Sequence, residues 1–157
     1  MENHKILDHL GELPLRTEEQ EKEVYRLRFD ASVSLSSIRN AQYALFALGI
    51  ITIGSGLINS NDSVLNFSII MCLYYWACGL IVIKFPVVGI GMALALFTIL
   101  IGLSVVENIL NIFSGIFVKL GAYYFMIHGF LGGQALRRTT KNAFDLGISE
   151  EELREPI

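Results

Sequence analysis

From residue 41 to residue 117 the chain carries only three charged side chains, Asp62, Lys84 and Glu107. A helix or strand at the surface of a soluble domain needs a polar face toward water, and such domains are about 25% charged. The whole chain of 157 residues is 53% hydrophobic and 17% charged. Because the central segment has no face for water, the sequence predicts helices that cross a lipid bilayer.

Four apolar runs in the sequence have the length of membrane-spanning helices, which need about 20 mainly apolar residues. They predict spans over residues 41–58, 64–83, 86–106 and 115–136. Short connections leave neighbouring helices antiparallel, which favours a compact bundle. The expected fold class is therefore all-α, an integral membrane four-helix bundle. The polar stretch 107–114 is expected to extend the third helix or to lie in the headgroup region.

The basic residues predict how the chain is oriented, because lysine and arginine gather on the cytoplasmic side of a membrane. They flank the spans at Arg26, Arg28, Arg39, Lys84, Arg137, Arg138 and Lys141. Both termini are thus expected in the cytoplasm, the C-terminal one as an acidic tail over residues 137–157. Residues 1–40 lack the apolar core of a secretory signal, so the first span is expected to act as its own insertion signal.

A cytoplasmic helix is predicted before the first span, over residues 17–40. Thr17 and Gln20 have the spacing of a capping box, which favours a helix start. Leu27, Leu35 and Ile38 form part of an apolar stripe along this helix. Two interpretations remain open: the helix prolongs the first span and packs on its own bundle, or the stripe binds a partner protein.

A candidate polar site lies around His128 in the last span. At about 100° per residue, His128 shares a helix face with Tyr124 and with small residues such as Gly121. Because small residues let helices approach closely, this face is expected to point into the bundle, toward Thr98 and Tyr75. Two roles remain open for His128. It forms a hydrogen bond with a hydroxyl group and fixes the helix register, or it carries protons or a ligand, since histidine changes charge near neutral pH.

Lys119 lies on the opposite face of the same span, near its outer end. Its stem can lie in hydrocarbon while its ammonium reaches the interface, or it can pair with Glu107, which is expected at a similar depth. Both roles are structural.

The sequence shows no catalytic set, no cofactor-binding motif and no metal-ligand cluster. A zinc site needs three or four protein ligands, and His128 with Cys72 and Cys78 does not supply them. The two cysteines are six residues apart on one helix, about 9 Å along its axis, so they are expected to be reduced thiols that cannot bridge each other.

The closing span, GIFVKLGAYYFMIHGFLGGQALRR, resembles the last helix of small four-span bacterial membrane proteins of uncharacterised function. The matching positions are Gly115, Ile116, Lys119 and Gly129. The resemblance implies a bacterial inner membrane and no particular activity.

These observations predict a non-enzymatic, multi-pass membrane component that acts by assembling with itself or with another protein, and they offer no sign of nucleic-acid binding. The alternative is a small ion or proton channel, or a transporter, with a polar path near His128.

Overall fold

The computed structural model describes residues 17–58, 62–107, 116–149 and 153, except the side chains of residues 104–107. The described part is all-helical and contains no strand. Its helices are α1 (Glu18–Ile58), α2 (Asp62–Lys84), α3 (Pro86–Glu107) and α4 (Ile116–Asp145). Each of the four is long and apolar enough to cross a membrane. The expected all-helical class is confirmed, and each predicted span falls largely within one of these helices.

Helix α1 joins the predicted cytoplasmic helix and the predicted first span into one helix of 41 residues. At 1.5 Å per residue it is about 60 Å long, roughly twice the hydrocarbon thickness of a bilayer. The predicted capping box opens it: the Gln20 N–H donates to Thr17 Oγ1 at 3.4 Å, and the Thr17 N–H donates to Gln20 Oε1 at 3.0 Å. The helix runs without a break from the first predicted segment into the second, as the first interpretation of this region expects.

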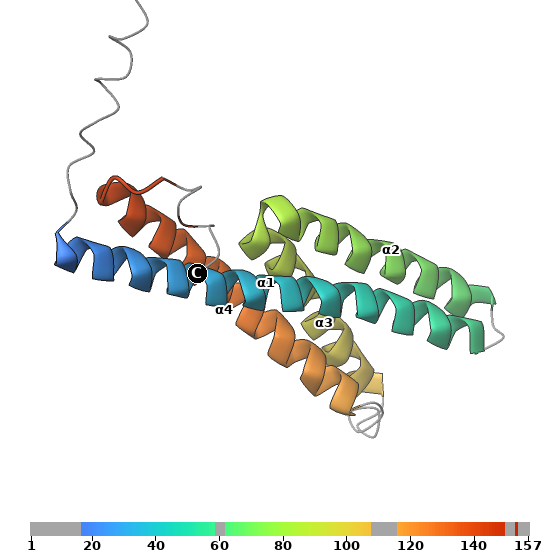
Figure 1. Ribbon diagram of the computed structural model, residues 1–157. Coiled ribbons are helices and arrows are strands. Elements are labelled where there is room, and N and C mark those ends of the chain that lie inside the picture. The colour runs from blue at the N-terminus through green and yellow to red at the C-terminus, as the bar shows by residue number, and fades with distance from the viewer. Residues whose placement is uncertain (1–16, 59–61, 108–115, 150–152, 154–157) are drawn as a thin grey trace, which may run out of the picture.

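Helix α1 is the element around which the others gather (Figure 1). Its most extensive contacts are with α4 and with α2, and α3 packs against both α2 and α4. Figure 1 shows α2 beside the C-terminal half of α1, whereas the C-terminal half of α4 lies beside the N-terminal half of α1. Among the described helices, only α1 and α4 extend to this end of the bundle (Figure 1).

Small residues allow α1 and α2 to approach closely. A Cβ atom placed on Gly49 would lie 2.5 Å from Trp76 Nε1, and one on Gly56 would lie 2.5 Å from the Ser68 side chain. The Trp76 indole N–H donates to the Phe46 carbonyl at 3.3 Å. Four small or polar residues of α2 are buried in the bundle: Ser68, Cys72, Tyr75 and Gly79.

Helix α4 continues nine residues beyond the predicted end of its span, so residues 137–145 are helical and not part of a tail. It ends in a glycine cap at Gly147, whose φ is +71°. The Ile148 N–H donates to the Ala143 carbonyl at 2.9 Å, and the Gly147 N–H donates to the Phe144 carbonyl at 3.0 Å. These two bonds form a Schellman motif, which satisfies carbonyls that a helix end leaves open.

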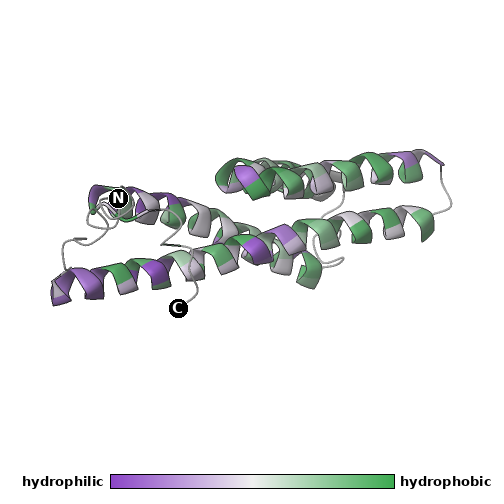
Figure 2. Ribbon diagram, turned by 45° about the horizontal axis from the view of Figure 1, so that its top comes forward, coloured by the Kyte–Doolittle hydropathy of each residue, from purple (hydrophilic) through white to green (hydrophobic). Residues whose placement is uncertain are grey.

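The segment after this cap returns to α1. Ile148 and Leu153 are buried together with Ala143 of α4 and with Val24 and Leu27 of α1. This terminal cluster holds together the ends of the two helices that extend beyond α2 and α3. Figure 2 shows that polar residues concentrate at these two ends, while α2, α3 and the second half of α1 are largely hydrophobic.

Candidate functional site

The predicted polar site around His128 is not assembled in the structure. His128, Tyr124 and Thr98 are exposed on the outside of the bundle, whereas Tyr75 is 3% exposed in its core. The prediction that His128 and Tyr124 point into the bundle is therefore wrong, although Gly132, on the same face, is buried against α1. An interior polar path that joins these four residues is not present.

The inner face of α4 is centred about 130° from His128 around the helix, more than a third of a turn, at about 100° per residue. It consists of Ala122, Met126, Gly129 and Gly133, all buried. A Cβ atom on Gly133 would lie 3.0 Å from Val87 Cγ2 of α3. Close backbone approach at the glycines, and not burial of the polar side chains, thus sets the rotation of this helix.

The hydroxyl of Thr98 forms a hydrogen bond with Tyr123 and not with Tyr124, the tyrosine of the predicted site. The Tyr123 hydroxyl donates to Thr98 Oγ1 at 2.9 Å, and the Thr98 hydroxyl donates to the Leu94 carbonyl at 2.8 Å. The Tyr123 ring also lies edge-on to Phe97, with centroids 5.2 Å apart. Thr98 and Tyr123 therefore link α3 to α4 near the bundle surface.

His128 and Tyr124 form a pair of their own on the outward face of α4. Their ring centroids are 4.4 Å apart, with the planes inclined at 50°. Tyr124 is 58% exposed. At 1.5 Å per residue, His128 is about 18 Å from the start of α4 and about 13 Å from Arg137. Two polar aromatic side chains thus face outward near the middle of the apolar part of the helix.

The remaining predicted residues have mixed outcomes. Lys119 is half-buried on α4, and Glu107 is the last residue of α3, but the Glu107 side chain lies outside the described residues. Of the predicted partner surface, Leu27 is buried in the terminal cluster and Ile38 in the main core, while Leu35 is half-buried. The stripe therefore packs mainly on the chain itself.

A groove that sequence reasoning missed lies where the turn between α2 and α3 meets α1 and α4. Its volume is about 860 Å³. We call it the basic groove; it is lined by Leu35, Ile38, Arg39, Gln42, Val82, Ile83, Lys84, Phe85, Pro86, Val87, Val88, Gly133, Leu136, Arg137, Thr140, Lys141 and Phe144.

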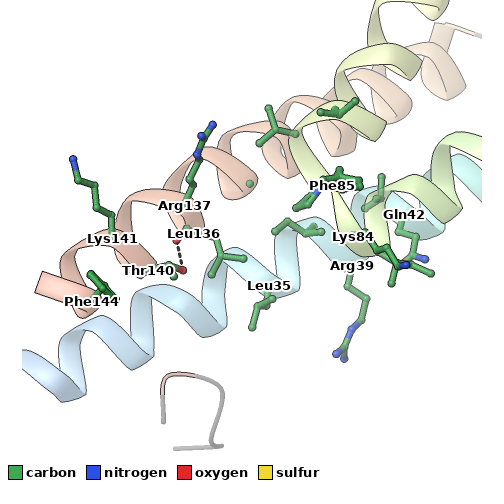
Figure 3. Close-up of a pocket in the computed structure, with 17 residues that line it drawn as sticks. Leu35, Arg39, Gln42, Lys84, Phe85, Leu136, Arg137, Thr140, Lys141 and Phe144 are labelled. Atoms are coloured by element: carbon green, nitrogen blue, oxygen red, sulfur yellow. Dashed lines mark hydrogen bonds between the residues drawn. The ribbon is translucent and has the colours of Figure 1, made fainter. Parts of the chain in front are cut away.

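The basic groove carries four cationic side chains, which come from three helices: Arg39, Lys84, Arg137 and Lys141. The described residues that line it include no Asp or Glu. Figure 3 shows Arg137 and Lys141 extending from α4 on one side and Arg39 extending from α1 on the other. The charges therefore lie on the rim, and the walls between them are mainly apolar.

The start of α3 adds to the positive character of this groove. The Gly89 N–H donates to the Phe85 carbonyl at 3.0 Å, which begins the helix. A helix leaves its first N–H groups without partners inside the helix, and Val87 and Val88 of this first turn line the groove. Such N–H groups, together with the helix dipole, favour anions.

The signal for this groove was present in the sequence. Arg39, Lys84 and Arg137 each lie near the beginning or end of an apolar run. These three cations line one groove because α1 and α4 cross there. The periodicity of the sequence does not predict where two helices cross.

The described residues contain no group of three or more His, Cys, Asp or Glu side chains placed to hold a metal ion. Cys72 and Cys78 are both free and buried, as predicted.

Comparison of the chain with family models, with curated proteins and with solved structures found no match.

Proposed function

We propose that the chain is a non-enzymatic, multi-pass membrane protein that associates with a second copy of itself through the outward face of α4. Four apolar helices of spanning length support membrane insertion. The distribution of lysine and arginine supports cytoplasmic termini, and the resemblance of the last span supports a bacterial inner membrane.

The observation that carries the proposal is the outward position of the His128–Tyr124 pair. Near the middle of a bilayer these groups meet hydrocarbon, where a polar group without a hydrogen-bond partner costs free energy. Polar side chains in such positions are expected to find partners across helix contacts. A second protein surface at this face would supply them.

A second copy of the chain is the partner that fits this face. Copies inserted in the same direction can be related by a two-fold axis along the membrane normal, which brings residues of equal depth together. A neutral imidazole has one donor and one acceptor, and a tyrosine hydroxyl can do both. His128 of one copy can therefore bond to Tyr124 or His128 of the other.

The test measures dimerisation of the purified protein in lipid nanodiscs or liposomes by energy transfer between labelled copies. His128→Leu should weaken the dimer about three- to tenfold, because membrane hydrogen bonds contribute about 0.6 kcal/mol each and two are lost by symmetry. Leu73→Ala is the matched control, since Leu73 is 60% exposed on the outward face of α2. It should leave the dimer unchanged.

Disulfide crosslinking locates the contact. A cysteine at Tyr124 should crosslink two copies under mild oxidation, and a cysteine at Leu73 should not. A monomeric wild-type protein, or equal crosslinking at both positions, would contradict the proposal. The alternative of a channel or transporter has less support among the described residues, because Tyr75 is buried in the core whereas His128 and Thr98 are exposed.

A further inference from the structure

Three cations of the basic groove, Arg39, Lys84 and Arg137, lie near the ends of apolar runs. Gly133 of α4 packs on Val87 and Pro86 at the start of α3, which places Lys84 and Arg137 at neighbouring depths. Arg39 belongs to the same groove. In each helix the apolar run meets polar residues near these positions. In a bilayer such positions correspond to the headgroup region, where anionic lipids attract lysine and arginine.

The walls of the groove are suited to hydrocarbon. Ile38 and Val82 are buried at its inner side, and Leu136 is half-buried beside them. Toward the outside, the exposed side chains of Ile83 and Val88 continue the apolar surface. A volume of about 860 Å³ falls within the range of about 300–1,000 Å³ that is usual for small-molecule sites.

We propose that the basic groove binds an anionic phospholipid. The headgroup lies at the cationic rim formed by Arg39, Lys84, Arg137 and Lys141, and the upper part of an acyl chain lies along the apolar wall. This inference rests on the membrane insertion proposed above but not on self-association, so a failed dimerisation test leaves it unaffected.

The combination of charges and apolar walls selects this occupant. Arginine forms paired hydrogen bonds with phosphate oxygens, and lysine adds a point charge. The first-turn N–H groups of α3 also favour an anion. A soluble phosphate would use these groups but not the apolar wall, and a zwitterionic lipid would use the wall but bring a cation toward the rim.

The first experiment compares two lipids with identical acyl chains. Dioleoyl phosphatidylglycerol and dioleoyl phosphatidylcholine are titrated onto the detergent-purified protein, and bound lipid is counted by native mass spectrometry. We expect the phosphatidylglycerol to bind at least tenfold more tightly. Equal binding of the two lipids would overturn the proposal.

Two double variants separate the groove from the general surface charge. Arg39→Gln with Arg137→Gln removes two groove cations, and Arg26→Gln with Arg138→Gln removes two exposed cations that do not line it. The first pair should weaken phosphatidylglycerol binding about 25-fold, from about fivefold per cation near the surface. The second pair should change binding less than threefold. Equal losses would overturn the proposal.

A third arm tests the apolar wall and the source of the phosphate. Val88→Trp places a larger side chain in the groove without changing any charge, and it should weaken phosphatidylglycerol binding at least fivefold. Inorganic phosphate at millimolar concentration should not displace the lipid. If Val88→Trp has no effect, or if inorganic phosphate competes, the site is one for soluble anions and the lipid assignment is wrong.

Discussion

Gly129 of α4 lies so close to Ala41 of α1 that a Cβ atom built on the glycine would overlap the Cβ atom of the alanine. The same position is 3.1 Å from Ile90 Cδ1 and 3.3 Å from the Ser37 carbonyl oxygen. Three helices therefore meet at one point where only a hydrogen atom fits. In membranes, close approach of this kind is a main source of attraction between helices.

Gly129→Ala is expected to destabilise the bundle by about 1–3 kcal/mol, the usual cost of overpacking a tight site. The measurement is reversible unfolding in mixed micelles, followed by the fluorescence of the single tryptophan, Trp76. Gly102→Ala is the control, because no described atom lies within 4 Å of a Cβ at that position. Equal losses of stability in the two variants would show that the α1–α4 contact is looser than described.

Gly147→Ala is expected to loosen the end of α4. A residue other than glycine in the left-handed region costs about 1–2 kcal/mol, and Gly147 has a φ of +71°. Gly147→Asn should lose less stability than Gly147→Ala, because asparagine tolerates this conformation. Hydrogen exchange at the Ile148 amide, which closes the cap, should accelerate in the order wild type, asparagine, alanine. An unchanged alanine variant would contradict the role of the cap.

Leu27→Ala is expected to release the C-terminal segment from α1 without unfolding the bundle. Leu27 is buried against residues that follow the end of α4, so its truncation removes about 2 kcal/mol of apolar packing, at the lower end for a buried leucine. Limited proteolysis should then cut after residue 145 sooner than in the wild type. Tyr25→Ala, at an exposed neighbouring position, should be cut at the wild-type rate. If Tyr25→Ala is cut as fast as Leu27→Ala, the terminal cluster does not protect the C-terminal segment from the protease.

The positions of the helices could be predicted because the length of an apolar run is a property of the sequence alone. The helix that contains the span 41–58 ends at Ile58, and the helix for 86–106 begins at Pro86, as predicted. The rotation of α4 could not be obtained in this way. In a membrane helix the inner and outer faces are both apolar, so hydrophobic periodicity does not tell them apart.

The polar site was misplaced for the same reason. The face that holds His128 also holds Gly121 and Gly132, within about 40° of His128 on one side. Gly132 is buried, but a Cβ on Gly121 would meet no described atom within 4 Å. The tight glycines are Gly129 and Gly132, which face α1. Helix α4 has several glycines, and the partner helix decides which of them make contact. At this crossing α1 contributes Ser34, Ser37 and Ala41.

The hydrogen bond between Tyr123 and Thr98 gives the most direct test of the observed rotation. The Tyr123 hydroxyl is 2.9 Å from Thr98 Oγ1, whereas the sequence favoured Tyr124 as the nearby tyrosine. In a double-mutant cycle, Tyr123→Phe and Thr98→Val should show a coupling energy of about 0.6 kcal/mol, the average for membrane helices. The cycle with Tyr124→Phe should show none, because Tyr124 stacks on His128 on the outward face. A coupling confined to Tyr124 would mean that α4 is rotated toward the orientation first expected from the sequence, and it would return His128 to the interior of the bundle.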